Sequence, residues 1–276
     1  MNITAALVNE LRQMTGAGMM DCKKALVETE GDIEKAIDLL RKKGIAKAAK
    51  RADRVAKEGA VFAKVADDHK FGAIIMVNCE TDFVAKNADF VAFTKNLLDL
   101  AVANGIKTAD ELKEAKMGDL TVNDAITNQS AVTGEKIELG AYQVLESEYV
   151  TFYNHHGNSL ATIVAMNKNF DKVEEISHEI ALQIAAMAPI SVDENDVPEE
   201  TKQRELEIGM DQARQEGKPE AMVEKIALGK LNKFYRQSTL LNQDSLAVDG
   251  KSVRQYIQDA DKDATVTAFV RLKLGE

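Results

Sequence analysis

The same order of elements occurs twice in the middle of the chain: a strand, a turn, a strongly apolar strand and an amphipathic helix. In the first occurrence the strands cover residues 59–65 and 71–79, with His69 in the turn. In the second, one strand ends at Tyr153 and the next covers residues 160–166. Apolar runs bounded by turn residues are typical of strands, and apolar residues three or four apart are typical of helices. The pattern predicts two related units, each a β-hairpin followed by a helix.

Further apolar patterns surround these two units. We expect helices over residues 109–116 and 122–131 and a strand over residues 137–145. Near the C-terminus, residues 253–260 are predicted to form a helix and residues 265–274 a strand that joins a sheet begun far earlier. This mixture of helices and antiparallel strands predicts an α+β fold.

A pair of helices is predicted after the second unit. Pro198 suits the first turn of a helix, and Gly217, Lys218 and Pro219 place a helix stop directly before a helix start. The two helices must therefore run antiparallel. Their sparse apolar residues are typical of a thin hairpin that protrudes by about 25 Å at 1.5 Å per residue. A protruding hairpin is commonly an interaction device, and a hairpin buried in a larger bundle is the alternative.

The first 50 residues carry three helical patterns with clear punctuation. The first is expected to end at Gly16, the second at Gly31 and the third, capped by Asp32, at Gly44. Three apolar stripes on so short a segment can bury one another only as a compact bundle, which resembles three-helix modules of the ubiquitin-associated type. The predicted organisation is therefore as follows: a UBA-like three-helix domain at 1–50, a basic linker at 51–57, core subdomain 1 at 58–145, core subdomain 2 at 146–196, a helical hairpin at 197–235, and a C-terminal helix with a returning strand at 236–276.

Charge and apolar content exclude several classes of protein. Lysine and arginine number 35 against 45 acidic residues, a net charge of −10 that is a poor match for a phosphate backbone, so we expect no direct nucleic-acid partner. The chain contains no run of 18 apolar residues, so no membrane span is predicted, and the N-terminus lacks the pattern of a secretory signal. We expect a cytoplasmic protein without a membrane partner, whose oligomeric state the sequence leaves open.

The chain lacks the usual patterns of catalytic and metal sites. Cys22 and Cys79 are too few for a disulfide framework or a zinc site. His155 and His156 lie between two strands, where a hairpin turn is the simpler interpretation and a metal or partner contact the alternative. No nucleophile elbow or phosphate-binding loop occurs. We therefore expect no enzymatic activity, no cofactor and no metal.

One segment reverses the overall charge. Between Arg41 and Lys57 the only acid is Asp53, against eight basic residues: Arg41, Lys42, Lys43, Lys47, Lys50, Arg51, Arg54 and Lys57. We call these residues the basic strip. A solvated linker helix is the favoured interpretation, and a strip that meets an acidic partner surface is the alternative.

An aromatic residue stands out in the polar connection between the first apolar strand and the next helix. Phe83 lies within Glu80–Asn87, where it either packs back into its own core or is exposed for use. The pattern alone favours packing.

Three stretches together resemble a known family. They are Leu11–Leu26 (LRQMTGAGMMDCKKAL), Val77–Ala85 (VNCETDFVA), and Gly217-Lys218-Pro219 followed by Lys225, Gly229, Lys233 and Phe234. In this order, and over essentially the whole chain, they resemble bacterial translation elongation factor Ts. One departure is visible after Gly134-Glu135, where the family often has a paired arginine and this chain reads Lys136-Ile137-Glu138-Leu139.

The resemblance implies a protein partner. Members of this family are nucleotide exchange factors for elongation factor Tu, a GTPase, and speed its release of GDP. The segment that matches Thr81, Asp82, Phe83 and Val84 inserts near the nucleotide site of the GTPase and displaces its Mg²⁺ ion. The resemblance further implies contacts from Arg12, Met19 and Met20 in the N-terminal domain and from the second unit near His156. A non-catalytic adaptor that recruits a protein through the three-helix domain is the alternative function.

Overall fold

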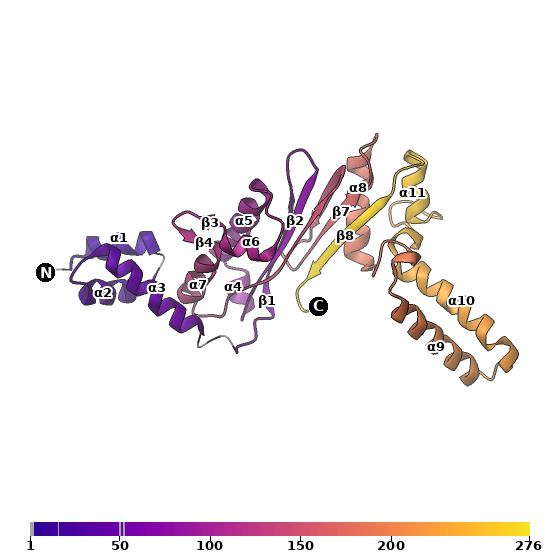
Figure 1. Cartoon of the computed structure of the whole chain (residues 1–276), viewed down its shortest axis with the longest axis horizontal. Helices are drawn as coiled ribbons and strands as arrows, with labels where there is room; N and C mark the ends of the chain where they lie inside the picture. The colour runs from indigo at the N-terminus through magenta and orange to yellow at the C-terminus, as the bar shows by residue number, and fades with distance from the viewer. Residues whose placement is uncertain (1–2, 16, 50, 52) are drawn as a thin grey trace.

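The computed structural model describes residues 3–15, 17–49, 51 and 53–276, with side chains described outside 45–49. The expectations placed on Gly16, Lys50 and the side chain of Lys47 lie outside the described residues. The elements confirm a mixed α+β fold, drawn out along one axis, with the N-terminal helices at one end and a helical hairpin at the other (Figure 1).

The N-terminal helices are α1 (Ala5–Thr15), α2 (Met19–Glu28) and α3 (Ile33–Ala49). They bury one another around a small apolar cluster made of Val8, Leu11, Cys22, Ala25, Leu26 and Ala36. Thr4 and Asp32 accept hydrogen bonds from the backbone N–H groups of Leu7 and Lys35 and so cap the first and third helices.

The prediction that the third helix ends at Gly44 is wrong, because α3 continues to Ala49. Gly44 is buried, and a methyl group placed on it would lie 3.9 Å from the Cβ atom of Ala131. Ala131 belongs to α7 (Val122–Thr133), which packs against α3. A glycine can therefore serve helix packing here rather than helix termination.

The first unit is a three-stranded antiparallel sheet with a helix on one face. Its strands are β1 (Glu58–Val65), β2 (Phe71–Cys79) and β5 (Glu138–Glu146), and β2 is central as the apolar pattern predicts. The helix α5 (Ala88–Ala103) covers one face. Shorter elements precede β5 in the chain: α4 (Asp82–Ala85), α6 (Ala109–Glu114), β3 (Lys116–Met117), β4 (Leu120–Thr121) and α7.

The second unit repeats this arrangement. Its strands are β6 (Tyr149–Asn154), β7 (Leu160–Met166) and β8 (Val266–Lys273), and α8 (Val173–Met187) packs on the sheet. The predicted return of the last strand to an earlier sheet is confirmed by the pairing of β8 with β7. Both central strands carry an irregularity at the same place, between Met76 and Val77 in β2 and between Ala165 and Met166 in β7.

The two sheets pack face to face between the two helices. Val61 and Ile74 of the first sheet meet Ala161 and Ile163 of the second in one apolar cluster. The opposite face of the first sheet contributes to the cluster under α5, and the opposite face of the second to the cluster under α8. Each central strand is thus buried on both faces, which explains why its sequence is almost continuously apolar.

The helical hairpin consists of α9 (Glu199–Gln215) and α10 (Glu220–Ser238) and extends away from the sheets (Figure 1). The two helices approach closely at Gly209, where an added methyl group would lie 3.1 Å from the Cα atom of Ala227. The remaining elements are the 3-10 turns Glu194–Asp196 and Leu240–Asn242 and the helix α11 (Val253–Ala260). None of the described helices is both long and apolar enough to cross a lipid bilayer.

Candidate partner-binding site

The segment that follows β2 is a single turn of helix, although the sequence predicted a connecting loop there. Thr81 has extended backbone angles and its Oγ1 atom accepts a hydrogen bond from the N–H group of Val84 at 3.4 Å, so Thr81 caps α4. Asn87 caps α5 in the same way, by accepting from the N–H groups of Asp89 and Phe90. Caps at both sides set the direction of this turn.

The side chain of Phe83 projects from α4 into solvent with an exposed fraction of 84%. The prediction from the pattern alone, that Phe83 packs into its own core, is therefore wrong. Its neighbours take the core positions instead: Ala85 is buried in the cluster under α5, and Val84 packs against that cluster. In a helix of one turn, consecutive residues point in different directions, so anchoring Val84 and Ala85 leaves Phe83 outside.

Beside the ring lies an exposed ion pair. The Nζ atom of Lys86 donates to the Oδ2 atom of Asp82 at 2.6 Å. The hydrogen bond from Lys86 holds the pKa of the Asp82 carboxyl below its ordinary value, and the same bond raises the pKa of Lys86. At neutral pH the turn therefore presents an aromatic ring next to a carboxylate and an ammonium group.

The sequence patterns did not predict that two carboxylates, of Glu80 and Glu135, bind backbone N–H groups at the start of this turn and in the connection before β5. Glu135, in the connection between α7 and β5, accepts hydrogen bonds from the backbone N–H groups of Glu80 and Thr81, each at 3.0 Å, and from the Thr81 hydroxyl at 2.6 Å. Glu80 accepts a hydrogen bond from the N–H group of Lys136 at 2.6 Å. The sequence signal for the position of Glu135 was the preceding glycine, Gly134. In the structure Gly134 adopts the left-handed conformation (φ 79°) and ends α7.

The other predicted contact residues are exposed but lie apart from the Thr81–Val84 turn along the chain. Arg12, Met19 and Met20 are exposed on α1 and α2, in the three-helix domain. His156 is exposed in the turn between β6 and β7.

The turn that carries His156 lies against β1. The N–H group of Val61 donates to the carbonyl of Asn158 at 2.8 Å. Because the start of β1 pairs with the end of β2, at Glu58 and Cys79, both α4 and this turn lie beside the first half of β1. Both segments therefore adjoin β1: α4 packs against it, and the turn that carries His156 is hydrogen-bonded to it at Val61.

Three arginines of the basic strip contact the chain itself. Arg41 forms an ion pair with Asp124 of α7, Arg51 donates to the carbonyl of Ser130 at 2.7 Å, and Arg54 pairs with Glu80 at 3.2 Å. The strip is therefore more than the solvated linker that the sequence favoured, because these contacts join α3 and the start of the core to α7 and to the end of β2.

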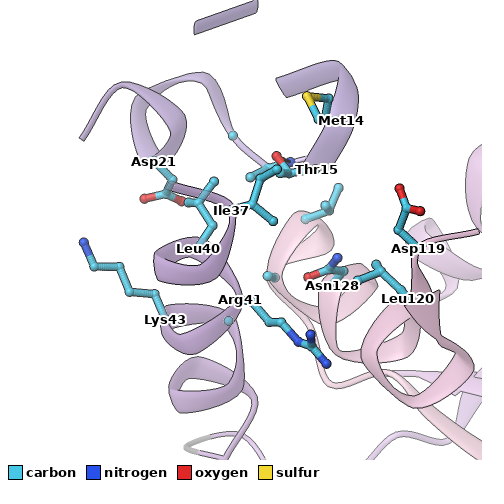
Figure 2. Close-up of a pocket in the computed structure, with 15 residues that line it drawn as sticks. Met14, Thr15, Asp21, Ile37, Leu40, Arg41, Lys43, Asp119, Leu120 and Asn128 are labelled. Carbon is cyan, nitrogen blue, oxygen red and sulfur yellow. Dashed lines mark hydrogen bonds between the residues drawn. The ribbon is translucent and has the colours of Figure 1, made fainter. Parts of the chain in front are cut away.

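A cavity of about 240 Å³ lies between the three-helix domain and α7 (Figure 2). Apolar side chains from both sides line most of it, among them Met14, Ile37, Leu40, Leu120, Ala131 and Val132. Figure 2 shows Arg41 reaching from α3 toward the α7 side. The cavity marks a junction that is held by a few polar contacts and is not fully packed.

Two of the histidines, His69 and His155, contact other side chains of this chain. His69 stacks on Tyr149 with ring centroids 4.8 Å apart, and its Nδ1 atom lies 3.1 Å from the carbonyl oxygen of Val150. His155 bonds to the hydroxyl of Tyr153 at 2.8 Å. Within the described residues, no group of three or more His, Cys, Asp or Glu side chains is arranged to hold a metal ion.

An exposed aromatic ring on a rigidly capped turn is typical of a protein that acts by contact with another macromolecule. Comparison with known proteins identifies the class. Residues 80–276 match the family described as "Elongation factor TS". The chain is 47% identical to elongation factor Ts of Christiangramia forsetii and 45% identical to that of Flavobacterium psychrophilum, each over 273 residues and 99% of both chains. Elongation factor Ts of Cytophaga hutchinsonii is 46% identical over 275 residues, again 99% of both chains.

These relatives are translation elongation factors. The chain belongs to the elongation factor Ts family.

Proposed function

We propose that this chain is a guanine nucleotide exchange factor that binds elongation factor Tu and accelerates its release of GDP by displacing the Mg²⁺ ion of that GTPase during translation elongation. The exposed ring of Phe83, held on a capped turn, is the observation that carries the proposal, and membership of the Ts family supports it. Exchange makes and breaks no covalent bond, so it requires no catalytic side chain. The site of action is the cytoplasm, where elongation takes place.

The chemistry of Mg²⁺ explains how one ring can weaken a nucleotide. This ion demands near-ideal octahedral geometry and bridges phosphate oxygens, so a small displacement of its ligands or waters loosens the grip on GDP. Phe83 is the wedge in this mechanism. Asp82, which precedes Phe83 in the chain and accepts a hydrogen bond from Lys86, perturbs the charge around the ion.

The free energy available from one ring is too small to offset GDP binding, so the factor must also contact the GTPase elsewhere. If GDP is held at nanomolar strength, about 12 kcal/mol of binding must be offset. Burying one phenylalanine contributes only about 1.5–3 kcal/mol. For this wider interface we propose contacts from the exposed Arg12, Met19 and Met20 of the three-helix domain and from the exposed His156.

The proposal implies reciprocity between the two ligands of the GTPase. A factor that weakens GDP binding is itself bound more weakly when GDP is present, because the coupling free energy is shared. The complex that contains both is therefore transient, and the factor can act repeatedly at amounts below those of the GTPase.

The test is the release of fluorescent GDP from purified elongation factor Tu. The parent chain should accelerate this release at substoichiometric amounts. The Phe83→Ala variant should still bind the GTPase, but at saturation GDP release should be about 10–100-fold slower than with the parent chain, the equivalent of about 1.5–3 kcal/mol. Leu246→Ala removes another exposed apolar side chain, 61% exposed and remote in sequence, and serves as the matched control. Exchange by Phe83→Ala at the parent rate would contradict the wedge role.

A second candidate, the adaptor, is favoured by the exposed methionines of α2. Met19 and Met20 are 59% and 63% exposed, and adjacent exposed methionines suit a surface that binds other proteins. Binding to the GTPase without any acceleration of GDP release would support the adaptor in place of the exchange factor.

A further inference from the structure

The Thr81–Val84 turn depends on a carboxylate that lies 54 residues further along the chain. The Oε2 atom of Glu135 accepts from the N–H groups of Glu80 and Thr81, and its Oε1 atom accepts from the Thr81 hydroxyl at 2.6 Å. Three hydrogen bonds to one ionised group are stronger than three between neutral groups. The carboxylate of Glu135 thus accepts three hydrogen bonds from the residues just before α4.

The contact is reciprocal. Glu80 accepts from the N–H group of Lys136 at 2.6 Å, and Arg54 donates to both of its oxygens at 3.2 and 3.3 Å. The N–H group of Lys136, helped by Arg54, holds the pKa of the Glu80 carboxyl below its ordinary value. We call Glu80 and Glu135, with the backbone groups they bind, the carboxylate clasp. It joins the end of β2 to the connection before β5.

The clasp acts on the cap of α4 through one hydroxyl group. The Thr81 hydroxyl donates to Glu135, and this leaves its lone pairs free to accept from the N–H group of Val84. A helix of four residues has no stability of its own, so its position depends on its cap and on its packing. Cys79 adds a further contact, because its thiol donates to the carbonyl of Thr81 at 3.2 Å.

The loop that carries Glu135 is itself well anchored. Gly134 ends α7 in the left-handed conformation, and the N–H group of Glu135 donates to the Thr133 hydroxyl at 3.3 Å. The buried Ile137 donates through its N–H group to Ser130 at 2.9 Å. The carboxylate is therefore presented from a fixed point, whereas the ring of Phe83 has no packing that would fix it.

We propose that Glu135 is a positioning residue for nucleotide exchange: it holds Thr81 and thereby directs Phe83 outward, without itself touching the partner. This inference rests on the proposed function of Phe83. It differs from a general contribution to stability, because loss of the clasp should misdirect the ring while the two sheets and their helices stay folded.

The experiment compares Glu135→Ala and Glu135→Gln in the GDP release assay at increasing concentrations of factor. Glu135→Ala should lower the maximal release rate by about 5–50-fold and leave the half-saturating concentration within about threefold of the parent value. Glu135→Gln should restore most of the rate, because its amide oxygen can accept from both N–H groups and its amide nitrogen can donate to Thr81.

The double variant Glu135→Ala with Phe83→Ala separates positioning from a merely structural role. If Glu135 acts through the ring, the double variant should be no slower than the slower single variant within about twofold, because a misdirected ring has little left to lose. Additive losses would overturn the proposal, and so would a Glu135→Ala rate equal to that of the parent.

Hydrogen exchange of the isolated factor provides a second readout. The N–H groups of Glu80 and Thr81 should exchange faster in Glu135→Ala, whereas those of β7 should be unchanged. Unchanged protection at Glu80 and Thr81 would also overturn the positioning role. If the parent chain fails to accelerate GDP release, the proposed function is wrong and the positioning role falls with it. If only Glu135→Ala matches the parent, the positioning role alone is wrong.

Discussion

The connections that follow the two central strands occupy equivalent places in the two units, but one exposes its phenylalanine and the other packs it against the core. In the first unit, residues 80–87 form a capped turn that exposes Phe83. In the second, residues 167–172 lead to α8 without a side-chain cap, and Phe170 packs against the cluster under that helix. One aromatic residue is exposed to solvent, and the other packs against the core.

The polar contacts of the two connections also differ. Asn167 bonds to the strand that returns to its own sheet: it accepts from the N–H group of Thr265 at 2.9 Å and donates to the carbonyl of Asp263 at 2.7 Å. In the first unit the corresponding Asn78 donates to the carbonyl of Glu58, and the polar groups that follow are taken by Glu135. The strand geometry is shared, whereas the groups that bond to the two connections come from different distant segments of the chain.

Replacing each phenylalanine by alanine should give the largest effect we expect. One variant should lose exchange activity and the other should lose stability. Phe83→Ala should slow GDP release about 10–100-fold with little change in the free energy of unfolding, because the ring is exposed. Phe170→Ala should leave release near the parent rate and lower the free energy of unfolding by about 1–3 kcal/mol, because the ring is half-buried. Release kinetics and urea unfolding of both variants check this, and equal effects on either measurement would break the comparison.

The contact between the sheets offers the next largest effect. Gly72 is the second residue of the central strand of the first unit, where the second unit has Ala161. A methyl group on Gly72 would lie 2.6 Å from the Cγ1 atom of Val150 in the opposite sheet, so Gly72→Ala should lower the free energy of unfolding by about 1–3 kcal/mol. Urea denaturation measures it. In the double variant Gly72→Ala with Val150→Ala the total loss should be smaller than the sum of the two single losses, and additive losses would argue against this contact as the cause.

A third effect appears at alkaline pH. Burial, with the charges of Glu135 and Glu58 adding to it, raises the pKa of the Cys79 thiol from 9.0 to about 12. The unfolded chain therefore loses this proton at lower pH than the folded chain, so stability falls as pH rises above about 9, by up to 1.4 kcal/mol per pH unit.

The variant Cys79→Ala isolates this contribution. Its stability at neutral pH should be lower, but its decline between pH 9 and 11 should be shallower than that of the parent chain. Urea unfolding over this pH range gives both slopes. Parallel slopes would show that the thiol is not responsible. The second unit has Lys168 at the corresponding position and carries no such buried thiol.

The order of elements was predictable from the sequence because it depends on local patterns. Apolar runs bounded by turns indicated both hairpins, and Gly217 with Pro219 indicated the antiparallel helices. The exposure of Phe83 was not predictable in this way, because it depends on which side chains of the turn pack into the cluster under α5, and Val84 and Ala85 take those positions. Gly44 shows the same limitation, since only the packing of α7 against α3 explains why the helix continues there.

The smallest effect concerns the ion pair that joins the second connection to the end of α11. Lys168 donates to Asp261 at 2.7 Å, and this hydrogen bond holds the pKa of the Asp261 carboxyl below its ordinary value of 3.8. A carboxyl of lowered pKa contributes stability that is present above pH 4 and lost as pH falls through the folded pKa. Lys168→Met should therefore shift the unfolding midpoint only slightly at neutral pH, and less still in high salt, because both groups are partly exposed. A shift as large as that of Gly72→Ala, or one that persists at pH 2, would mean that Lys168 holds this connection by packing rather than by charge.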